Sequence, residues 1–423
     1  MIKLLKNNKI AIIGTGISGL SLAYFLNDYA QVTVFEKEAR LGGHSRTIEV
    51  NYEENEIPVD TGFIVFNHKT YPLLTQFFNH LGVKTEKSNM SLSVSIDGGK
   101  HEWSANSLDA FFAQRSHLFN PRIWKGVYDL LRFNKFALSV IESNPNISLK
   151  ELLDKMKLGP WFRSNYLLPM GGAIWSSSPK QMLEFPAKTF VNFFNNHGLL
   201  SINDHPQWYT VAGGSVEYIK RISQRLGDKI RLKEEVEEVI RESENILIKT
   251  RKGGIYKFDH VVFACHSDQA FHILNDPSND EKYALESIPY KENKAVLHCD
   301  QAFMPQRKKC WSSWNVLLDG NQQEQDISLT YWMNRLQNID KKLPLFLTLN
   351  PSHEIEEKFI FDKHTFSHPI FGPSSDEGKK MVTHIQGKKN TWYCGAYLGN
   401  GFHEDGIRSA SKVASAMGAP LPW

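Results

Sequence analysis

Three glycines near the start of the chain constrain its fold more than any other feature. An apolar run, Ile10 to Ile13, is followed by Gly14, Gly16 and Gly19 and then by an apolar helical pattern from Leu20 to Leu26. In this spacing the first glycine makes a tight turn, the second lets backbone approach a pyrophosphate, and the third lets the helix pack on the strand. The pattern predicts a strand, a turn and a helix whose N-terminus, at Ile17 and Ser18, binds phosphates.

A second predicted strand ends in an acid at the position that this unit requires. Val32 to Phe35 form a β-type run, and Glu36 and Lys37 follow it. A carboxylate about 20 residues after the glycine turn can accept hydrogen bonds from a ribose hydroxyl. Because strand, turn, helix, strand and acid all agree, we favour a dinucleotide site over a turn with a purely structural role.

Size, charge and cysteine content limit the other function classes. A chain of 423 residues is long for one core, which predicts two intertwined domains. Its net charge is only +3, from 49 basic and 46 acidic residues, so nucleic acid is not an expected partner. Four dispersed cysteines without a CxxC pair favour reduced thiols and a cytoplasmic location. No apolar window reaches the length of a membrane span, which leaves peripheral contact with the inner membrane open.

Strand and helix signals further along the chain divide it into alternating blocks. Residues 230–240, 245–250 and 261–265 are typical of strands, whereas 107–141 carry apolar residues at helical spacing and 288–350 are rich in strand formers. These patterns predict an α/β Rossmann-like domain built from residues 1–70, 206–275 and 386–423. Residues 71–205 and 276–385 are expected to form an interleaved α+β substrate-binding domain with a mixed sheet and helices.

Further glycine stretches favour a flavin over a nicotinamide cofactor. Arg40 and Arg46 flank the pair Gly42-Gly43, and Gly62 lies in the segment Asp60-Thr61-Gly62-Phe63. At the far end, Trp392-Tyr393-Cys394-Gly395-Ala396-Tyr397 reads as a strand and turn, and residues 401–410 open a final helix. Each stretch lets backbone or a positive charge approach a phosphate or ribityl chain, which a nicotinamide site does not need.

With these motifs the chain resembles the flavin-containing amine oxidase superfamily, which includes monoamine oxidases, protoporphyrinogen oxidase and phytoene desaturases. The resemblance implies FAD bound by a domain of the amine oxidase and glutathione reductase type. Ala396 stands where the family usually has an acid, so Glu404 or Asp405 is expected to contact the ribityl hydroxyls, and His44 stands where arginine is common. The expected cofactor contacts are Gly14, Gly16, Ile17, Ser18, Gly19, Glu36, Lys37, Gly42, Gly43, His44, Ser45, Gly62, Phe63, Ile64, Val236, Gly395, Glu404, Asp405, Gly406 and Ile407.

Within this superfamily the chain more closely resembles a bacterial subgroup of NAD/FAD-binding proteins. The stretches that carry this similarity are residues 60–67, 170–176, 331–334 and 401–406. Members are similar to flavoproteins of fatty-acid modification, including desaturation of methyl-branched acyl chains. The resemblance therefore implies an apolar, lipid-like substrate and association with a lipid-modifying methyltransferase.

The substrate half gives aromatic residues but no catalytic motif. An amine substrate would favour an aromatic cage from Trp392, Tyr393 and Tyr397 with a lysine near the flavin, and no lysine has a recognisable place. A long apolar substrate needs a tunnel, for which fourteen aromatics are available, although most of them are expected to be core. They are Phe111, Phe112, Trp124, Trp161, Phe162, Trp175, Phe185, Phe190, Phe193, Phe194, Trp208, Trp311, Trp314 and Trp332.

Other reactive side chains are weaker candidates. His364 and His368 have the spacing of a metal pair, but Pro369 follows and no third ligand is evident, so no metal is expected. Cys265-His266 reads as the end of a buried strand, and a covalent flavin link through His44 or Cys394 is not needed when non-covalent contacts suffice. His403 and Tyr397 are the candidates for tuning or proton transfer at the flavin.

These observations favour an FAD-dependent oxidoreductase that transfers a hydride from a substrate C–H bond to the flavin and so desaturates a lipid or fatty-acyl chain. Three alternatives stay open. They are an amine oxidase acting on a small amine, a redox-neutral double-bond isomerase, and an FAD-binding partner subunit of a lipid-modifying enzyme.

Overall fold

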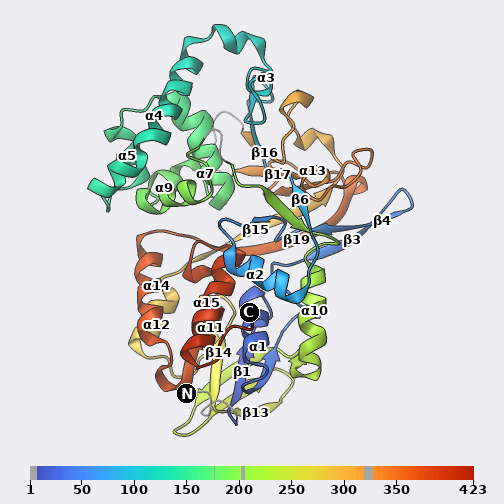
Figure 1. The fold of residues 1–423 in the computed structure, drawn as a ribbon, viewed down its shortest axis with the longest axis vertical. Helices are drawn as coiled ribbons and strands as arrows, with labels where there is room; N and C mark the ends of the chain where they lie inside the picture. Colours follow the sequence, from blue (N-terminus) through green and yellow to red (C-terminus); the bar gives the residue numbers. More distant parts are fainter. Residues whose placement is uncertain (1–6, 176, 202–204, 319–326) are drawn as a thin grey trace.

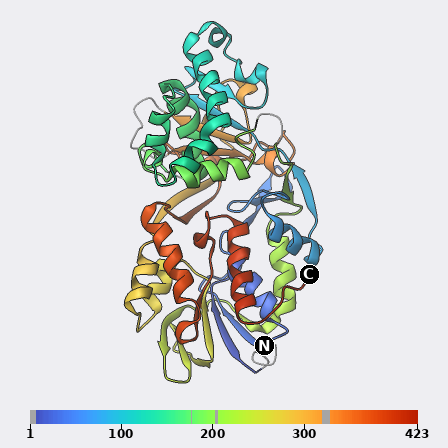
Figure 2. The same ribbon diagram turned by 60° about the vertical axis from the view of Figure 1, so that its left-hand side comes forward.

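The computed structural model describes residues 7–175, 177–201, 205–318 and 327–423. Figures 1 and 2 show an elongated molecule with a parallel sheet and its helices at one end. A second sheet crosses the middle, and a group of helices from the first half of the chain forms the other end.

A five-stranded parallel sheet is assembled from distant parts of the chain. Its order is β10 (Ile230–Arg231), β2 (Gln31–Phe35), β1 (Lys9–Ile13), β14 (His260–Phe263) and β20 (Thr391–Tyr393). The three inner strands β1, β2 and β14 are mostly apolar and buried, as expected where both faces of a sheet are covered. The predicted α/β class with a Rossmann-like, interleaved domain is confirmed.

Successive side chains of β1 point to opposite faces of this sheet. Ile10 and Ile12 pack under α1 (Ile17–Leu26), α2 (Pro72–Leu81), α10 (Val216–Leu226) and α15 (His403–Ala416). Ala11 and Ile13 pack on the other face, where α11 (Ser267–Ile273), α12 (Asn279–Glu286), α14 (Pro373–Ile385) and a meander of β11 (Val236–Arg241), β12 (Ile246–Thr250) and β13 (Ile255–Phe258) lie.

The second sheet has seven strands and is mostly antiparallel, with β16 and β7 pairing in parallel. Two small sheets accompany it. One is the hairpin of β3 (Thr47–Tyr52) and β4 (Asn55–Asp60), and the other has β9 (Trp208–Val211) between β5 (Phe66–Asn67) and β6 (Thr85–Ser88). The order of the large sheet is β19 (Ile360–Pro369), β15 (Tyr290–His298), β18 (Phe346–Leu349), β17 (Ser328–Trp332), β16 (Trp314–Leu318), β7 (Leu92–Ile96) and β8 (His101–Ser104).

The helical end surrounds its own apolar cluster. Its longest helix is α4 (Pro121–Ser143), which Asn120 caps and Pro121 begins, and whose residues Ile123, Phe133, Ala137 and Ile141 are buried. The other helices there are α3 (Leu108–Phe111), α5 (Leu149–Lys155), α6 (Pro160–Phe162), α7 (Leu168–Trp175), α8 (Pro179–Leu183) and α9 (Ala187–Asn196), while the short α13 (Met333–Leu336) follows β17.

The packing crosses the expected domain boundaries, which stay predictions. The β3–β4 hairpin was expected in the nucleotide-binding domain, but Val50 and Val59 share a buried cluster with Leu297 and Leu347 of the second sheet. Conversely, Leu285 of α12 and Val382 of α14 pack against the parallel sheet. Within the described ranges, no helix is both long and apolar enough to cross a membrane.

Candidate active site

A large cavity begins at the glycine turn after β1 and continues between the second sheet and the helical end. Its volume is about 1830 Å³, which exceeds the roughly 300–1,000 Å³ of a site for one small molecule. At one end it is lined by Gly14, Gly16 and Glu36, and at the other by Trp124 and Leu131 of α4. It therefore has room for a dinucleotide and a second molecule.

Backbone geometry at the first turn shows why each glycine is needed. Gly14 has φ +107° and donates its N–H to the carbonyl of Phe35 at 2.9 Å. A Cβ on Gly19 would lie 1.9 Å from the Gly14 carbonyl oxygen, so the helix could not approach the strand with a larger residue. A Cβ on Gly16 would meet no atom within 4 Å, because this residue faces the cavity at the N-terminus of α1.

The acid after β2 is held in a fixed position. Both the N–H of Thr15 (3.1 Å) and its hydroxyl donate to Glu36, and the N–H of Glu38 donates to the other carboxylate oxygen at 3.0 Å. Glu36, Lys37 and Glu38 all line the cavity. The carboxylate thus lies beside the glycine turn, where a ribose is expected.

The second glycine pair touches the first turn. Gly43 has φ +56°, and a Cβ there would lie 3.2 Å from the Cα of Gly16. Gly62 closes on the same segment, since a Cβ on it would lie 2.0 Å from the carbonyl oxygen of His44. Gly43, His44 and Gly62 line the cavity, whereas Gly42 packs against Ile219 and does not.

His403, at the start of α15, is fixed on the cavity wall. Its ring stacks on Phe63 with centroids 3.8 Å apart, and its Nε2 lies 2.8 Å from the Ser45 hydroxyl. Ser45 does not line the cavity and instead links His403 to Tyr218. Burial lowers the pKa of His403 to about 3, so this imidazole is neutral at physiological pH.

A histidine and aromatic cluster forms another part of the wall. The ring centroids of His44 and His368 are 5.2 Å apart, and His266 stacks on Tyr290 at 4.4 Å. Burial is the main reason why the pKa of each of the three histidines is lowered. His266 follows the last residue of β14 by three positions, so the expected strand is shorter and Cys265-His266 lies in the turn that lines the cavity.

Two buried polar atoms on this wall have no partner in the part of the chain that the structure describes: the His44 Nε2 and the Tyr397 hydroxyl. Because buried polar groups are normally hydrogen-bonded, a polar ligand is expected here. Together with the Gly16 turn, the Glu36 carboxylate and Val236 of β11 on the cavity wall, they fit a flavin dinucleotide.

The sequence profile described as "Flavin containing amine oxidoreductase" matches residues 17–338, which is more than half of the chain. The chain belongs to this family. Its cofactor is therefore FAD, and the expected resemblance is confirmed.

Relatives and solved structures agree with this family. The chain is 24% identical over 319 residues to the amine oxidase [flavin-containing] A of Sus scrofa, covering 71% of this chain and 58% of that one. It resembles the structure of a CLA-producing fatty acid isomerase from P. acnes (TM-score 0.69, 13% identity, 97% and 99% of the two chains). It is equally similar to cyclohexylamine oxidase from Brevibacterium oxydans (TM-score 0.70, 16% identity, 97% and 98%).

Besides Gly19, Gly42 and Ser45, four predicted cofactor contacts of this flavin family member do not line the cavity. Glu404 accepts the N–H groups of Leu73 and Leu74, and Asp405 accepts those of Asn400 and Phe402. These carboxylates accept hydrogen bonds from backbone and do not line the cavity, and their contact with the ribityl hydroxyls stays a prediction. The other two are Gly406, which packs against Ile17 and Ser18 of α1, and the fully buried Ile407.

Other predicted residues have mixed positions. Gly14, Gly16, Ile17, Ser18, Lys37, Phe63, Ile64, Val236 and Gly395 line the cavity, and Gly19 supports the turn from behind. Arg46 does not line the cavity, and its guanidinium forms a bidentate pair with Asp362 at 2.6 and 3.0 Å. Cys394 is buried in the core. All cofactor contacts stay predictions at the level of single residues.

Only some of the aromatic residues expected in an amine cage or a substrate tunnel line the cavity. Tyr397 lines the cavity, but Trp392 and Tyr393 of β20 do not, so these three residues form no cage. Most of the tunnel candidates that do not line it pack in the cluster of the helical end. The six that line it are Phe111, Phe112, Trp124, Phe193, Trp208 and Trp314.

Charge is unevenly distributed along the cavity. Its carboxylates, within the described ranges, come from residues 36–38 and 234–268, near the glycine turn. The walls from residues 71–201 and 290–349 contribute one charged side chain, Arg335, which donates to the Trp311 carbonyl at 3.2 Å and to Asn106 at 3.1 Å. Sequence reasoning missed Arg335, because no local motif marks it.

His364 and His368 lie on strand β19, not on a helix. Among the residues that the structure describes, no group of three or more His, Cys, Asp or Glu side chains could hold a metal ion.

Proposed function

We propose that the protein is an FAD-dependent oxidoreductase that takes a hydride from a C–H bond of a lipid-like substrate, most directly to desaturate a fatty-acyl chain. The observation that carries this proposal is the cavity, which extends from the glycine turn into an apolar space. That space is lined by side chains such as Phe111, Leu130 and Ile174. An extended apolar chain would bury its surface there.

The charges of the cavity favour a lipid over an amine. A protonated amine needs a carboxylate or an aromatic cage, and the walls from residues 71–201 and 290–349, as far as they are described, provide no Asp or Glu. The Arg335 guanidinium on these walls instead suits a carboxylate or ester head group.

FAD held at the Gly16 turn and beside Glu36 would supply a two-electron acceptor, and the hydride together with the proton lost from the adjacent carbon would account for its fully reduced form. The protein binds and orients the chain through its apolar walls and excludes water from it. His403 is neutral and hydrogen-bonded through Nε2. It therefore suits a role in positioning Phe63 and the cofactor edge better than a role as a cationic acid.

The test is anaerobic reduction of the purified protein's flavin, followed by absorbance, with fatty-acyl esters, free fatty acids and a panel of amines. We expect bleaching with the acyl substrates and a product with one additional double bond by mass spectrometry. Bleaching by amines alone, with release of peroxide in air, would establish the amine oxidase instead.

An amine oxidase is the second candidate, because the curated relatives carry that name. The chain, however, spans only 58% of the length of the Sus scrofa enzyme. A redox-neutral isomerase is the third, in line with the fatty acid isomerase whose fold the chain shares. A product with an unchanged number of double bonds would identify it.

A further inference from the structure

The segment from Leu108 to Phe136 exposes an unusual concentration of large hydrophobic side chains, which we call the apolar tip. In the described part of the chain eleven such side chains are exposed, and seven belong to this segment. Phe119 is 86% and Leu108 81% exposed. Clustering of this kind marks a binding surface, whereas isolated exposed side chains do not. The seven are Leu108, Leu118, Phe119, Trp124, Tyr128, Leu131 and Phe136.

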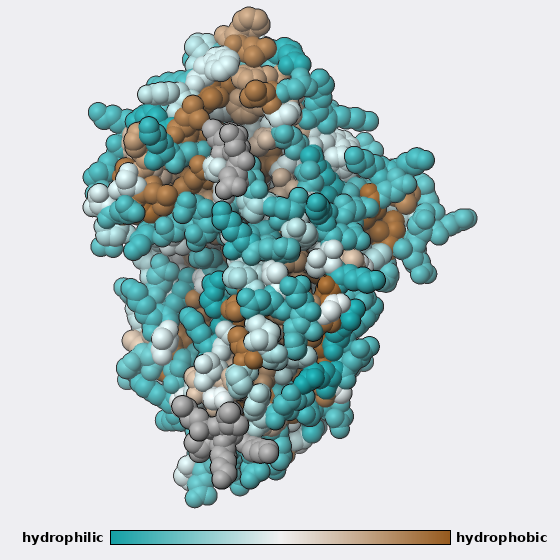
Figure 3. Space-filling model, in the orientation of Figure 1, coloured by the Kyte–Doolittle hydropathy of each residue, from teal (hydrophilic) through white to brown (hydrophobic). Residues whose placement is uncertain are grey.

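Helix α4 carries most of this surface. Its inner face, with Ile123, Phe133 and Ala137, is buried in the helical end. Trp124, Tyr128 and Leu131 follow one another at helical spacing on the outer side. Figure 3 shows hydrophobic surface over α3 and α4 at the end of the molecule farthest from the parallel sheet. The helix is therefore apolar on two sides, and only one side is covered.

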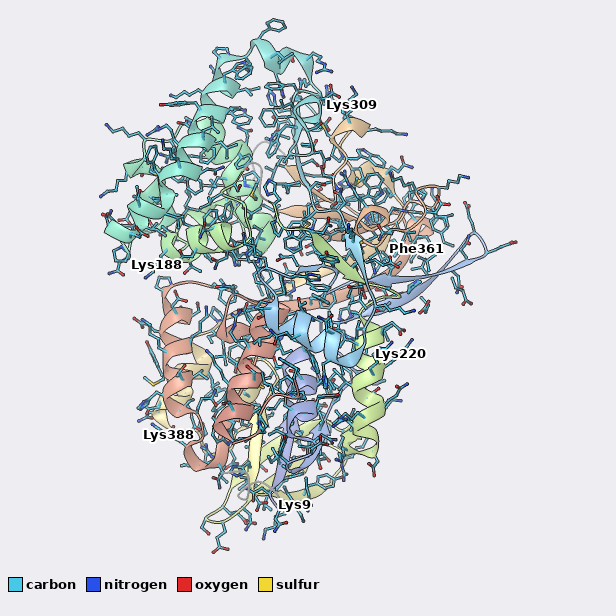
Figure 4. The ribbon with its side chains drawn as sticks, in the orientation of Figure 1. Lys9, Lys188, Lys220, Lys309, Phe361 and Lys388 are labelled. Atoms are coloured by element: carbon cyan, nitrogen blue, oxygen red, sulfur yellow. The ribbon has the colours of Figure 1, made fainter. Side chains whose placement is uncertain are left out.

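The apolar tip also carries the net charge of the protein. Residues 108–136 include five Lys or Arg and two Asp, while the whole chain has 49 basic and 46 acidic residues, so the remainder is balanced at 44 of each. Asp129 is buried and accepts the N–H of Gly159 at 2.8 Å. Asp109 pairs with Arg115 and with Lys309, which Figure 4 labels near the same end. Exposed charge at the tip is thus mainly positive.

We propose that the apolar tip docks on an anionic lipid bilayer, with α4 lying in the plane of the interface. An apolar helix face flanked by basic residues is the form that binds at such an interface, where Trp and Tyr rings are favoured. Arg122, Lys125 and Lys135 would face lipid phosphates. A second copy of the chain is a poorer occupant, since two positively charged surfaces repel each other.

The cavity opens onto this docking surface. Leu108, Leu118, Trp124 and Leu131 are exposed and also line the cavity. An apolar molecule could pass from the bilayer into the cavity without crossing water. Membrane docking would thus give the proposed lipid substrate a route into the cavity. The docking proposal itself does not depend on which substrate the cavity binds.

The experiment is co-sedimentation of the flavin-loaded full chain with vesicles of phosphatidylcholine alone or with 30% phosphatidylglycerol. We expect binding to the anionic vesicles and at least tenfold weaker binding for the F119S/Y128S/F136S variant, whose three positions do not line the cavity. Each of R122Q, K125Q and K135Q should weaken binding roughly fivefold. The matched control is L232S/I255S/Y283S, which removes exposed hydrophobic side chains elsewhere and should bind as the wild type does.

Absence of wild-type binding to the anionic vesicles overturns the proposal, as does a tip variant that binds like the control. A dimer in sedimentation velocity that the tip variant abolishes, without vesicle binding, would assign the surface to a second copy. Flavin absorbance verifies that each variant is folded. If vesicles are bound but only amines reduce the flavin, the docking surface stands and the proposed function fails.

Discussion

At the scale of single residues, two glycines of one motif have separable roles. A side chain at Gly16 would enter only the cavity, whereas a Cβ on Gly19 would collide with the carbonyl of Gly14. We therefore expect Gly16→Val to lower the ratio of FAD to protein at least tenfold while the apoprotein's free energy of unfolding changes by less than about 1 kcal/mol. Flavin absorbance and urea unfolding of the apoprotein measure the two effects.

Gly19→Ala is the matched comparison. Overpacking at this contact should destabilise the apoprotein by about 1–3 kcal/mol. Equal destabilisation by both substitutions would show that Gly16 has a structural role only, and would remove the assignment of this turn to the pyrophosphate.

Arg335 provides a second test at this scale. If its guanidinium binds the head group of a fatty acid, Arg335→Gln should raise KM for a free fatty acid about tenfold or more, because hydrogen bonds to charged groups contribute roughly 1.5–3 kcal/mol. kcat and the KM for the matching methyl ester should change little. Lys309→Gln, an exposed cation that does not line the cavity, is the control. An equal KM change for acid and ester would contradict the head-group role.

At the scale of elements, local patterns predicted β1, α1 and β2 because each carries its own signal within a few residues. Contacts between segments far apart in the chain could not be predicted from such local patterns. The glycine–acid segment at residues 404–406 has the form of a flavin motif, but its carboxylates cap Leu74 and Asn400, partners that no local pattern reveals. Likewise, the apolar residues of α4 predict a buried helix face. The sequence does not distinguish the exposed Tyr128 from the buried apolar residues of the same helix.

His298 ties the end of β15 to its neighbour and makes the fold sensitive to acid. Its ring contacts the Thr348 hydroxyl at 2.7 Å and accepts the Asp300 N–H at 3.1 Å. Burial lowers its pKa to about 4. Below pH 6.5 the unfolded chain binds a proton that the folded chain does not, so stability is complete above pH 6.5 and falls as the pH drops toward 4.

The expected loss from this histidine is about 3 kcal/mol between pH 6.5 and 4. Urea unfolding of the holoprotein should therefore show a shallower pH dependence for His298→Gln than for the wild type. His384→Gln, at an exposed position on α14 that does not line the cavity, should leave the dependence unchanged. Parallel curves for all three proteins would exclude a role for His298.

At the scale of the whole molecule, the fold joins two halves through one continuous cavity. The FAD site is built from short motifs at the ends of strands and helices, and members of the family share these motifs. The sequence therefore predicted the cofactor well. The substrate depends on how α4, α7 and the second sheet enclose space, which follows from packing between segments far apart in the chain. For this reason the sequence indicated a lipid only through resemblance, abundant aromatic residues and the lack of a well-placed lysine, and the substrate stays a proposal.

The length of that cavity should set substrate preference. Each buried methylene contributes about 0.8 kcal/mol, so kcat/KM for saturated acyl esters should rise roughly fourfold per carbon until the apolar space is filled, and then level off. Val127 lines the cavity from α4, and the adjacent Tyr128 does not. Val127→Trp should therefore move the plateau to shorter chains by a few carbons, whereas Tyr128→Trp should leave it in place. Anaerobic flavin reduction across a series of chain lengths measures both, and a flat series would mean that the apolar space does not hold the reacting chain.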